Sequence, residues 1–161
     1  MLGHSHRRES QEESDALINA KTKAALAAGL NPIVCVGETL TQREANETES
    51  VVGQQIAGSL ADLNTEQLKD TVIAYEPVWA IGTGKTATSQ QAQDVHAFIR
   101  GEINKSHGEE VAKAVRIQYG GSVKPANAEE LLGQPDVDGA LVGGASLEAR
   151  SFSDIINNTR T

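Results

Sequence analysis

A glutamate beside a glycine loop is the residue of this chain best suited to acid–base chemistry. Glu76 follows the apolar run 72–75, Pro77 fixes the next backbone angle, and Gly82 and Gly84 lie in the loop that comes after. A carboxylate at the end of a buried strand loses hydration unless a partner compensates it, so this position brings no structural benefit of its own. We interpret Glu76 as a candidate general base, and a paired structural carboxylate is the alternative interpretation.

The other chemically suggestive residues also follow apolar runs. Because the carboxyl ends of parallel strands meet at one edge of a sheet, residues placed there would share a site. Glycine has no Cβ, so two glycine pairs at one edge favour a backbone site for an anion such as phosphate, although a single pair is equally typical of a tight turn. The residues are His4 after 1–3, Glu38 after 33–36, Gly120–Gly121–Ser122 after 115–119, and Gly143–Gly144 after 140–142.

Apolar runs of strand length alternate with segments of helical period along the whole chain. This alternation predicts an α/β fold, in which parallel strands are joined by crossover helices. We expect the end of a strand at 1–3, then four complete strand–helix units, all in one domain over 1–161. The expected strands are 33–36, 72–75, 115–119 and 140–142. Five helices are expected. The first starts at Ser14 and ends at Gly29, the second runs through Val52, Ile56, Leu60 and Leu63, and the third runs from Ser89 to Ile103. The fourth includes Leu131 and Leu132, and the fifth includes Phe152, Ile155 and Ile156.

Composition excludes several classes of partner. The 161 residues carry a net charge of −8 and no long basic cluster, so nucleic acid is a poor partner. No apolar run approaches the ~20 residues that span a bilayer, and no secretory leader opens the chain, so we expect a cytoplasmic protein without a membrane partner. The single cysteine, Cys35, lies in an apolar run and is expected to be a buried hydrophobe rather than half of a disulfide.

Two nucleotide-binding motifs compete for the glycine loop. Gly84–Lys85–Thr86 imitates the end of a Walker A loop, but Trp79 stands where that motif needs its first glycine. Residues 82–87 fit G-x-G-x-x-A, yet the following helix is expected to begin only near Ser89, and a dinucleotide fingerprint needs a helix that opens on the glycines. Both motifs are therefore weak.

Five motifs together resemble the triosephosphate isomerase family along essentially all 161 residues, and bacterial members most closely. They are Gly3–His4–Ser5–His6–Arg7–Arg8, Cys35–Val36–Gly37–Glu38, the run 74–85, Tyr119–Gly120–Gly121–Ser122 and Leu141–Val142–Gly143–Gly144. The resemblance implies part of an eight-stranded (β/α)8 TIM barrel. It also implies the interconversion of dihydroxyacetone phosphate and glyceraldehyde 3-phosphate in glycolysis and gluconeogenesis.

The resemblance also implies roles for particular residues. Glu76 would remove the carbon-bound proton and His4, as a neutral imidazole, would polarise the carbonyl group; this family is a standard illustration of such paired acid–base tuning. Residues 77–86 would form a lid over the reaction intermediate. The substrate phosphate would be held by backbone amides of Gly82, Ser122, Gly143 and Gly144. No cofactor or metal is implied, and the full-length family forms homodimers.

Two departures from the family limit this expectation. His6 stands where the family has glutamate, which replaces a carboxylate acceptor and predicts reduced turnover. A complete barrel typically needs ~250 residues, and the equivalents of strands one to three, nearly all of strand four and the family's substrate-binding lysine are absent from these 161. We expect impaired activity and a tendency to aggregate, and a non-catalytic phosphate-binding half-barrel is the alternative function.

Overall fold

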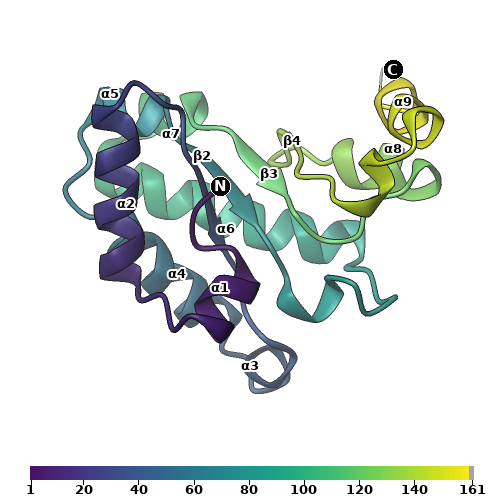
Figure 1. Cartoon of the computed structure of the whole chain (residues 1–161), viewed down its shortest axis with the longest axis horizontal. Helices are drawn as coiled ribbons and strands as arrows, with labels where there is room; N and C mark the ends of the chain where they lie inside the picture. The colour runs from purple at the N-terminus through teal and green to yellow at the C-terminus, as the bar shows by residue number, and fades with distance from the viewer. Residues whose placement is uncertain (160–161) are drawn as a thin grey trace.

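The computed structural model describes residues 1–159, which form one parallel sheet covered by helices (Figure 1). The strands lie side by side in chain order, and Leu2 forms one parallel bridge with Val34 on the other side of the first strand. The expected parallel sheet, and the strand end at 1–3, are therefore confirmed. The strands are β1 (Ile33–Val36), β2 (Val72–Tyr75), β3 (Ile117–Tyr119) and β4 (Gly139–Ala140).

The longer helices form a row that follows the order of the strands. Contacts run from α2 to α4, from α4 to α6, from α6 to α8 and from α8 to α9. Figure 1 shows α2 and α4 at one end of the molecule and α8 and α9 at the other. The helices are α1 (Ser5–Ser10), α2 (Asp15–Ala27), α3 (Leu40–Glu44), α4 (Thr48–Ser59), α5 (Thr65–Lys69), α6 (Ser89–His107), α7 (Glu109–Ala114), α8 (Pro125–Leu132) and α9 (Ala149–Asn157), with 3-10 turns η1 (Val78–Ala80) and η2 (Gly144–Ser146).

The two faces of the sheet differ in side-chain size because strand side chains alternate between them. The face that joins the main hydrophobic core carries large residues in register, such as Tyr75 opposite Tyr119 and Ile73 opposite Ile117. The other face carries Cys35 opposite Ala74, which is opposite Gln118. The large side chains fix the strands against the helices, which leaves the strand ends free to carry the polar residues described below.

Several helix boundaries differ from those expected from the sequence. Thr88, not Ser89, caps α6: its hydroxyl accepts from the Gln91 N–H, and the Gln91 side chain accepts from the Thr88 N–H, a reciprocal capping box. The helix through Val52 and Ile56 ends at Ser59, so Leu60 and Leu63 are buried in the turn that follows rather than within the helix.

The last two strands are shorter than expected. Residues 115–116 do not belong to β3, because Val115 is the C-cap of α7, a helix that the apolar pattern did not predict. The strand expected at 140–142 is instead β4 (Gly139–Ala140), and Leu141 continues only one backbone bond, to the Tyr119 carbonyl. The short helix α1 after His4 was also not predicted.

Among residues 1–159, no helix combines the length and the apolar character required to cross a membrane.

Candidate active site

Glu76 and His4 contact each other at the carboxyl edge of the sheet. The His4 Nδ1 atom lies 2.7 Å from Glu76 Oε1 and 2.9 Å from Oε2, and the Ser5 backbone N–H donates to Oε2 at 3.2 Å. The Glu76 side chain is 4% exposed, and the His4 side chain is 30% exposed. An ionised carboxylate only accepts hydrogen bonds, so Nδ1 carries the proton and Nε2 faces away from this pairing. The buried carboxylate therefore has the partner that its position demands.

Arg8 holds the segment that carries His4. Its guanidinium donates to the Gly3 carbonyl at 2.9 Å, to the Cys35 carbonyl at 3.1 Å and to the Asp15 carboxylate at 2.6 Å. These bonds tie the turn before His4 to the end of β1 and to the start of α2. In the sequence Arg8 stands out only as part of a motif, because contacts with distant carbonyls leave no local pattern that reveals this role.

The glycine turns expected to bind phosphate line one cavity with His4 and Glu76. This cavity measures about 510 Å³ and lies at the carboxyl edge of β2, β3 and β4. Glu38 does not line it, but the cavity brings together, from four loops, the six residues that were expected to act on or bind a substrate. Those residues are His4, Glu76, Gly82, Ser122, Gly143 and Gly144.

Several backbone N–H groups that line this cavity make no hydrogen bond within residues 1–159, and those of Gly82, Ser122, Gly143 and Gly144 are among them. Free N–H donors that converge on a cavity suit an oxyanion, because each can donate one bond to it. The Ser122 turn is itself held in shape, since Asn127 Nδ2 donates to the Ser122 carbonyl at 3.1 Å.

Lys124 is a lining residue that the sequence analysis missed. Within residues 1–159 its side chain forms no ion pair. The signal that could have revealed it is its position directly after the Gly-Gly-Ser turn.

Glu38 anchors the start of the glycine loop. Its carboxylate is fully buried and accepts from Trp79 Nε1 at 3.0 Å, from Arg43 Nη1 at 3.1 Å and from the Tyr75 hydroxyl at 3.1 Å. The Glu38 carbonyl also accepts from the Val78 N–H at 3.0 Å. Burial, and then the Glu38 charge, raise the pKa of the Tyr75 hydroxyl, so it stays protonated and able to donate. Trp79 is thus held as an anchor of the loop.

The loop after Trp79 is held by one further bond to this residue and by two glycines. Thr83 Oγ1 donates to the Trp79 carbonyl at 2.7 Å. Gly82 and Gly84 have φ angles of +67° and +80°, in the left-handed region that side chains rarely adopt. The helix after the loop begins at Ser89, well beyond the glycines, so the dinucleotide fingerprint lacks the geometry that it needs.

Two further residues lie close to the site without a direct chemical role. Burial raises the pKa of the Cys35 thiol, and the Glu76 charge adds to the rise, so Cys35 is not a nucleophile. His6 is exposed on α1, and its carbonyl accepts from the Ser10 hydroxyl at 2.6 Å. In the part of the chain that the structure describes, no group of three or more His, Cys, Asp or Glu residues could hold a metal ion.

The structure thus defines a class of protein: a parallel α/β fold with a histidine–glutamate pair and unpaired backbone N–H groups in one cavity at the carboxyl edge of its sheet. Comparisons with known proteins narrow this class. The sequence model for triosephosphate isomerase matches residues 1–159. The chain belongs to the triosephosphate isomerase family.

Individual relatives are similar over almost all of this chain. It is 60% identical over 158 residues to the triosephosphate isomerase of Chloroherpeton thalassium, which covers 98% of this chain and 63% of that protein. It is 62% identical over 156 residues to that of Rhodopirellula baltica, covering 97% of this chain and 61% of the relative. It is 60% identical over 156 residues to the triosephosphate isomerase of Herpetosiphon aurantiacus, and the match covers 97% of this chain and 62% of that protein. The chain thus spans less than two thirds of these relatives' length, and its fold is a partial (β/α)8 barrel.

Proposed function

We propose that this chain carries the acid–base pair and the phosphate site of a triose-phosphate isomerase. The observation that carries the proposal is the shared cavity of about 510 Å³, in which Glu76 and His4 lie opposite the glycine turns of the third and fourth strands. A substrate held at its phosphate by the turns would present its carbons to Glu76. Membership of the family, and relatives named triosephosphate isomerase, support the same assignment.

In the proposed reaction Glu76 removes a proton from the carbon next to the carbonyl group of dihydroxyacetone phosphate. The electron pair of the broken C–H bond forms the enediolate, whose negative oxygen His4 stabilises by donating a hydrogen bond. A proton then passes from the hydroxyl oxygen on the first carbon to the enediolate oxygen on the second, with the His4 imidazole as its carrier. Glu76 returns its own proton to the second carbon, which yields glyceraldehyde 3-phosphate. The proton that leaves one carbon arrives on the other, so no cofactor is consumed.

The contact between His4 and Glu76 describes the resting site rather than the reacting one. With Nδ1–H donating to Glu76, a neutral His4 has an Nε2 atom that accepts hydrogen bonds and cannot donate to a carbonyl oxygen. Substrate would therefore have to replace this contact, turning Glu76 towards the carbon and moving the His4 proton to Nε2. We propose that the loop 77–86 closes over the site during this change and excludes water.

The phosphate group would be held by the N–H groups of Gly82, Ser122, Gly143 and Gly144. Since the chain carries a net charge of −8, its overall field does not attract an anion, and these local donors have to supply the affinity. We further propose a cytoplasmic location and, in the complete assembly of the family, a homodimer. We also propose that His6 lowers turnover because it replaces the carboxylate that the family has at this position, so His6→Glu should raise turnover.

Two measurements on the purified chain test the proposal. Titration with inorganic phosphate, followed by calorimetry, should show one saturable site, and Gly143→Pro should weaken it by removing an N–H donor. A coupled assay for glyceraldehyde 3-phosphate should show slow isomerisation of dihydroxyacetone phosphate by the chain, alone or mixed with a polypeptide covering the part of a relative that the chain does not match. Glu76→Gln should abolish this activity and keep phosphate binding.

The outcomes separate the candidate functions. Phosphate binding without isomerisation in either preparation would support the non-catalytic phosphate-binding half-barrel instead. Isomerisation that survives Glu76→Gln would contradict the assignment of the base. If phosphate does not bind at all, both functions are wrong for this chain.

A further inference from the structure

Glu76 lies between two glycines from the neighbouring strand ends, with its main chain against Gly37 and its side chain against Gly120. A Cβ atom at Gly37 would lie 1.8 Å from the Glu76 carbonyl oxygen and 2.6 Å from its carbonyl carbon. On the other side, a Cβ at Gly120 would lie 2.8 Å from Glu76 Cγ. The Glu76 N–H also donates to the Val36 carbonyl at 2.7 Å. The position of the candidate base is therefore set by the loop after β1 as much as by its own strand.

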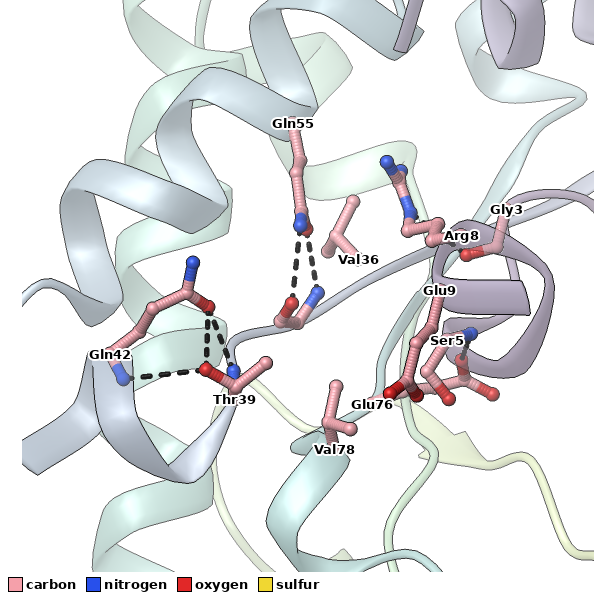
Figure 2. A pocket seen from close by; sticks show the side chains of 11 residues that line it. Gly3, Ser5, Arg8, Glu9, Val36, Thr39, Gln42, Gln55, Glu76 and Val78 are labelled. Carbon is pink, nitrogen blue, oxygen red and sulfur yellow. Dashed lines mark hydrogen bonds between the residues drawn. The ribbon is translucent and has the colours of Figure 1, made fainter. Parts of the chain in front are cut away.

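Gln55 of α4 holds Gly37 by both of its backbone groups. The Gly37 N–H donates to Gln55 Oε1 at 2.7 Å, and Gln55 Nε2 donates to the Gly37 carbonyl at 3.1 Å. Gly37 lies just beyond β1, where the strand ladder ends, so the side-chain amide takes the place of a neighbouring strand. Figure 2 shows these two bonds running from Gln55 to the main chain of the loop.

Gln55 is itself fixed on a firmly packed helix. Its neighbours Val52 and Ile56 on α4 are buried in the main hydrophobic core, at 0% and 7% exposure. The Gln55 amide therefore fixes Gly37 relative to α4. Because Gly37 lies against the Glu76 main chain, it fixes the position of Glu76 in turn. The two bonds to Gly37 have ordinary lengths, and no other residue in the described part of the chain bonds to these two backbone groups.

A second cavity gives the loop room to move if these bonds are lost. It measures about 360 Å³, and its lining includes Gly37, Gln55, Val78 and Glu76. Figure 2 shows Gln55 on one side of it and Glu76 on the other. Because open space adjoins Gly37 on this side, packing alone does not hold it. The two hydrogen bonds of Gln55 add to the backbone bonds that join Val36 and Glu38 to the segment of Glu76.

We propose that Gln55 is a positioning residue for the base: through Gly37 it sets the place of the Glu76 carboxylate against His4. The proposal rests on the proposed function only where it calls Glu76 the base. It predicts that loss of the Gln55 amide displaces Glu76 and breaks its bond to His4, while the core and the rest of the sheet stay folded.

The test uses the full chain and reads the His4–Glu76 bond directly. Nuclear magnetic resonance spectra of the imidazole groups resolve the Nδ1–H of His4 among the four histidines, and a His4→Gln variant identifies its resonance. Gln55→Met keeps the side-chain length and removes both bonds to Gly37. Gln54→Met is the matched control, because Gln54 is the exposed neighbour on the same helix and makes no hydrogen bond through its side chain within residues 1–159.

We expect Gln55→Met to lose the His4 Nδ1–H resonance, or to shift it to the position of a free imidazole, while Gln54→Met leaves it in place. Gln55→Glu, which still accepts from the Gly37 N–H but cannot donate to its carbonyl, should weaken the resonance without removing it; this variant also decides the matter if Gln55→Met fails to fold. An unchanged His4 resonance in folded Gln55→Met, or in Gln55→Glu, would overturn the proposal. Neither result depends on phosphate binding or isomerisation, so failure of the proposed function would be seen separately.

Discussion

Alanine substitution of the two glycines beside Glu76 should have different effects. The change at Gly37 should destabilise the fold, and the change at Gly120 should disrupt the His4–Glu76 bond. At Gly37 the new Cβ meets the Glu76 carbonyl oxygen at 1.8 Å, about 1.7 Å closer than the ~3.5 Å at which heavy atoms pack. That clash is with main chain just beyond the ends of β1 and β2, so relief requires the two paired strand ends to separate. We expect Gly37→Ala to lower the free energy of unfolding by at least about 3 kcal/mol, at the upper end for overpacking.

Gly120→Ala should spare the fold and damage the site. Its Cβ meets Glu76 Cγ at 2.8 Å, so the side chain has to move by about 0.7 Å to reach normal contact. The same shift would lengthen the His4–Glu76 bond of 2.7 Å to about 3.4 Å, beyond the usual ~3.2 Å limit. We expect a loss of stability of only about 1 kcal/mol, together with loss of the His4 Nδ1–H resonance.

Urea unfolding followed by the fluorescence of Trp79, the chain's single tryptophan, measures the first effect, and the histidine spectrum measures the second. Gly101→Ala is the control, because a Cβ at this position in α6 meets nothing within 4 Å and should stabilise the helix by up to about 1 kcal/mol. The reasoning is refuted if Gly37→Ala unfolds at the same urea concentration as the parent chain. It is also refuted if Gly120→Ala keeps the His4 resonance unchanged.

Three further predictions concern strain, charge and pH. Glu12 has a φ angle of +50°, which disfavours side chains by roughly 1 kcal/mol, so Glu12→Gly should raise the unfolding free energy by about 0.5–1 kcal/mol in the same urea assay; a decrease would contradict this. Lys124→Met should weaken phosphate binding several-fold in calorimetry, because Lys124 lines the site cavity, whereas Lys113→Met on α7 should not; equal affinities would exclude a role for Lys124. Burial lowers the pKa of His96 from 6.5 to about 4. Between these two pH values His96 is therefore protonated in the unfolded chain and neutral in the folded chain. Stability should fall by about 3 kcal/mol as pH drops from 7 to 4, and His96→Gln should reduce that fall; equal pH profiles would show that His96 does not titrate this way.

The sequence predicted the sheet because its signal is local. Short apolar runs specified β1 and β2 to the residue, and their parallel order followed from the helices between them. The apolar pattern failed to predict the strand boundaries where an apolar residue lacks the hydrogen bonds of a strand. Val115 is apolar but caps the end of α7, and Leu141 is apolar but makes only one bond to the neighbouring strand. Periodicity cannot detect that difference.

The site was predictable to the extent that its residues stand at strand ends. His4, Glu76 and the glycine turns were found by position and then meet in one cavity, whereas Gln55 and Arg8 were not found. Both act on backbone groups far away in the chain, Gln55 on Gly37 and Arg8 on Cys35. A side chain that bonds to a distant carbonyl or N–H leaves no mark in its own neighbourhood of sequence, so only the structure reveals it.

The row of helices and strands in chain order has a consequence for how the molecule folds. Each strand pairs with the next one along the chain, so most of the core forms by adding one unit to its neighbour, with modest loop-closure entropy at each step. The bond between His4 and Glu76 is different, because it joins residues 72 positions apart and reaches past β1 to the end of β2. It can form only when the units between them are already in place. The His4–Glu76 contact is thus expected to form only after β1 and β2 have paired. It should also be lost early, so that partial opening of the chain disrupts the site before the core unfolds.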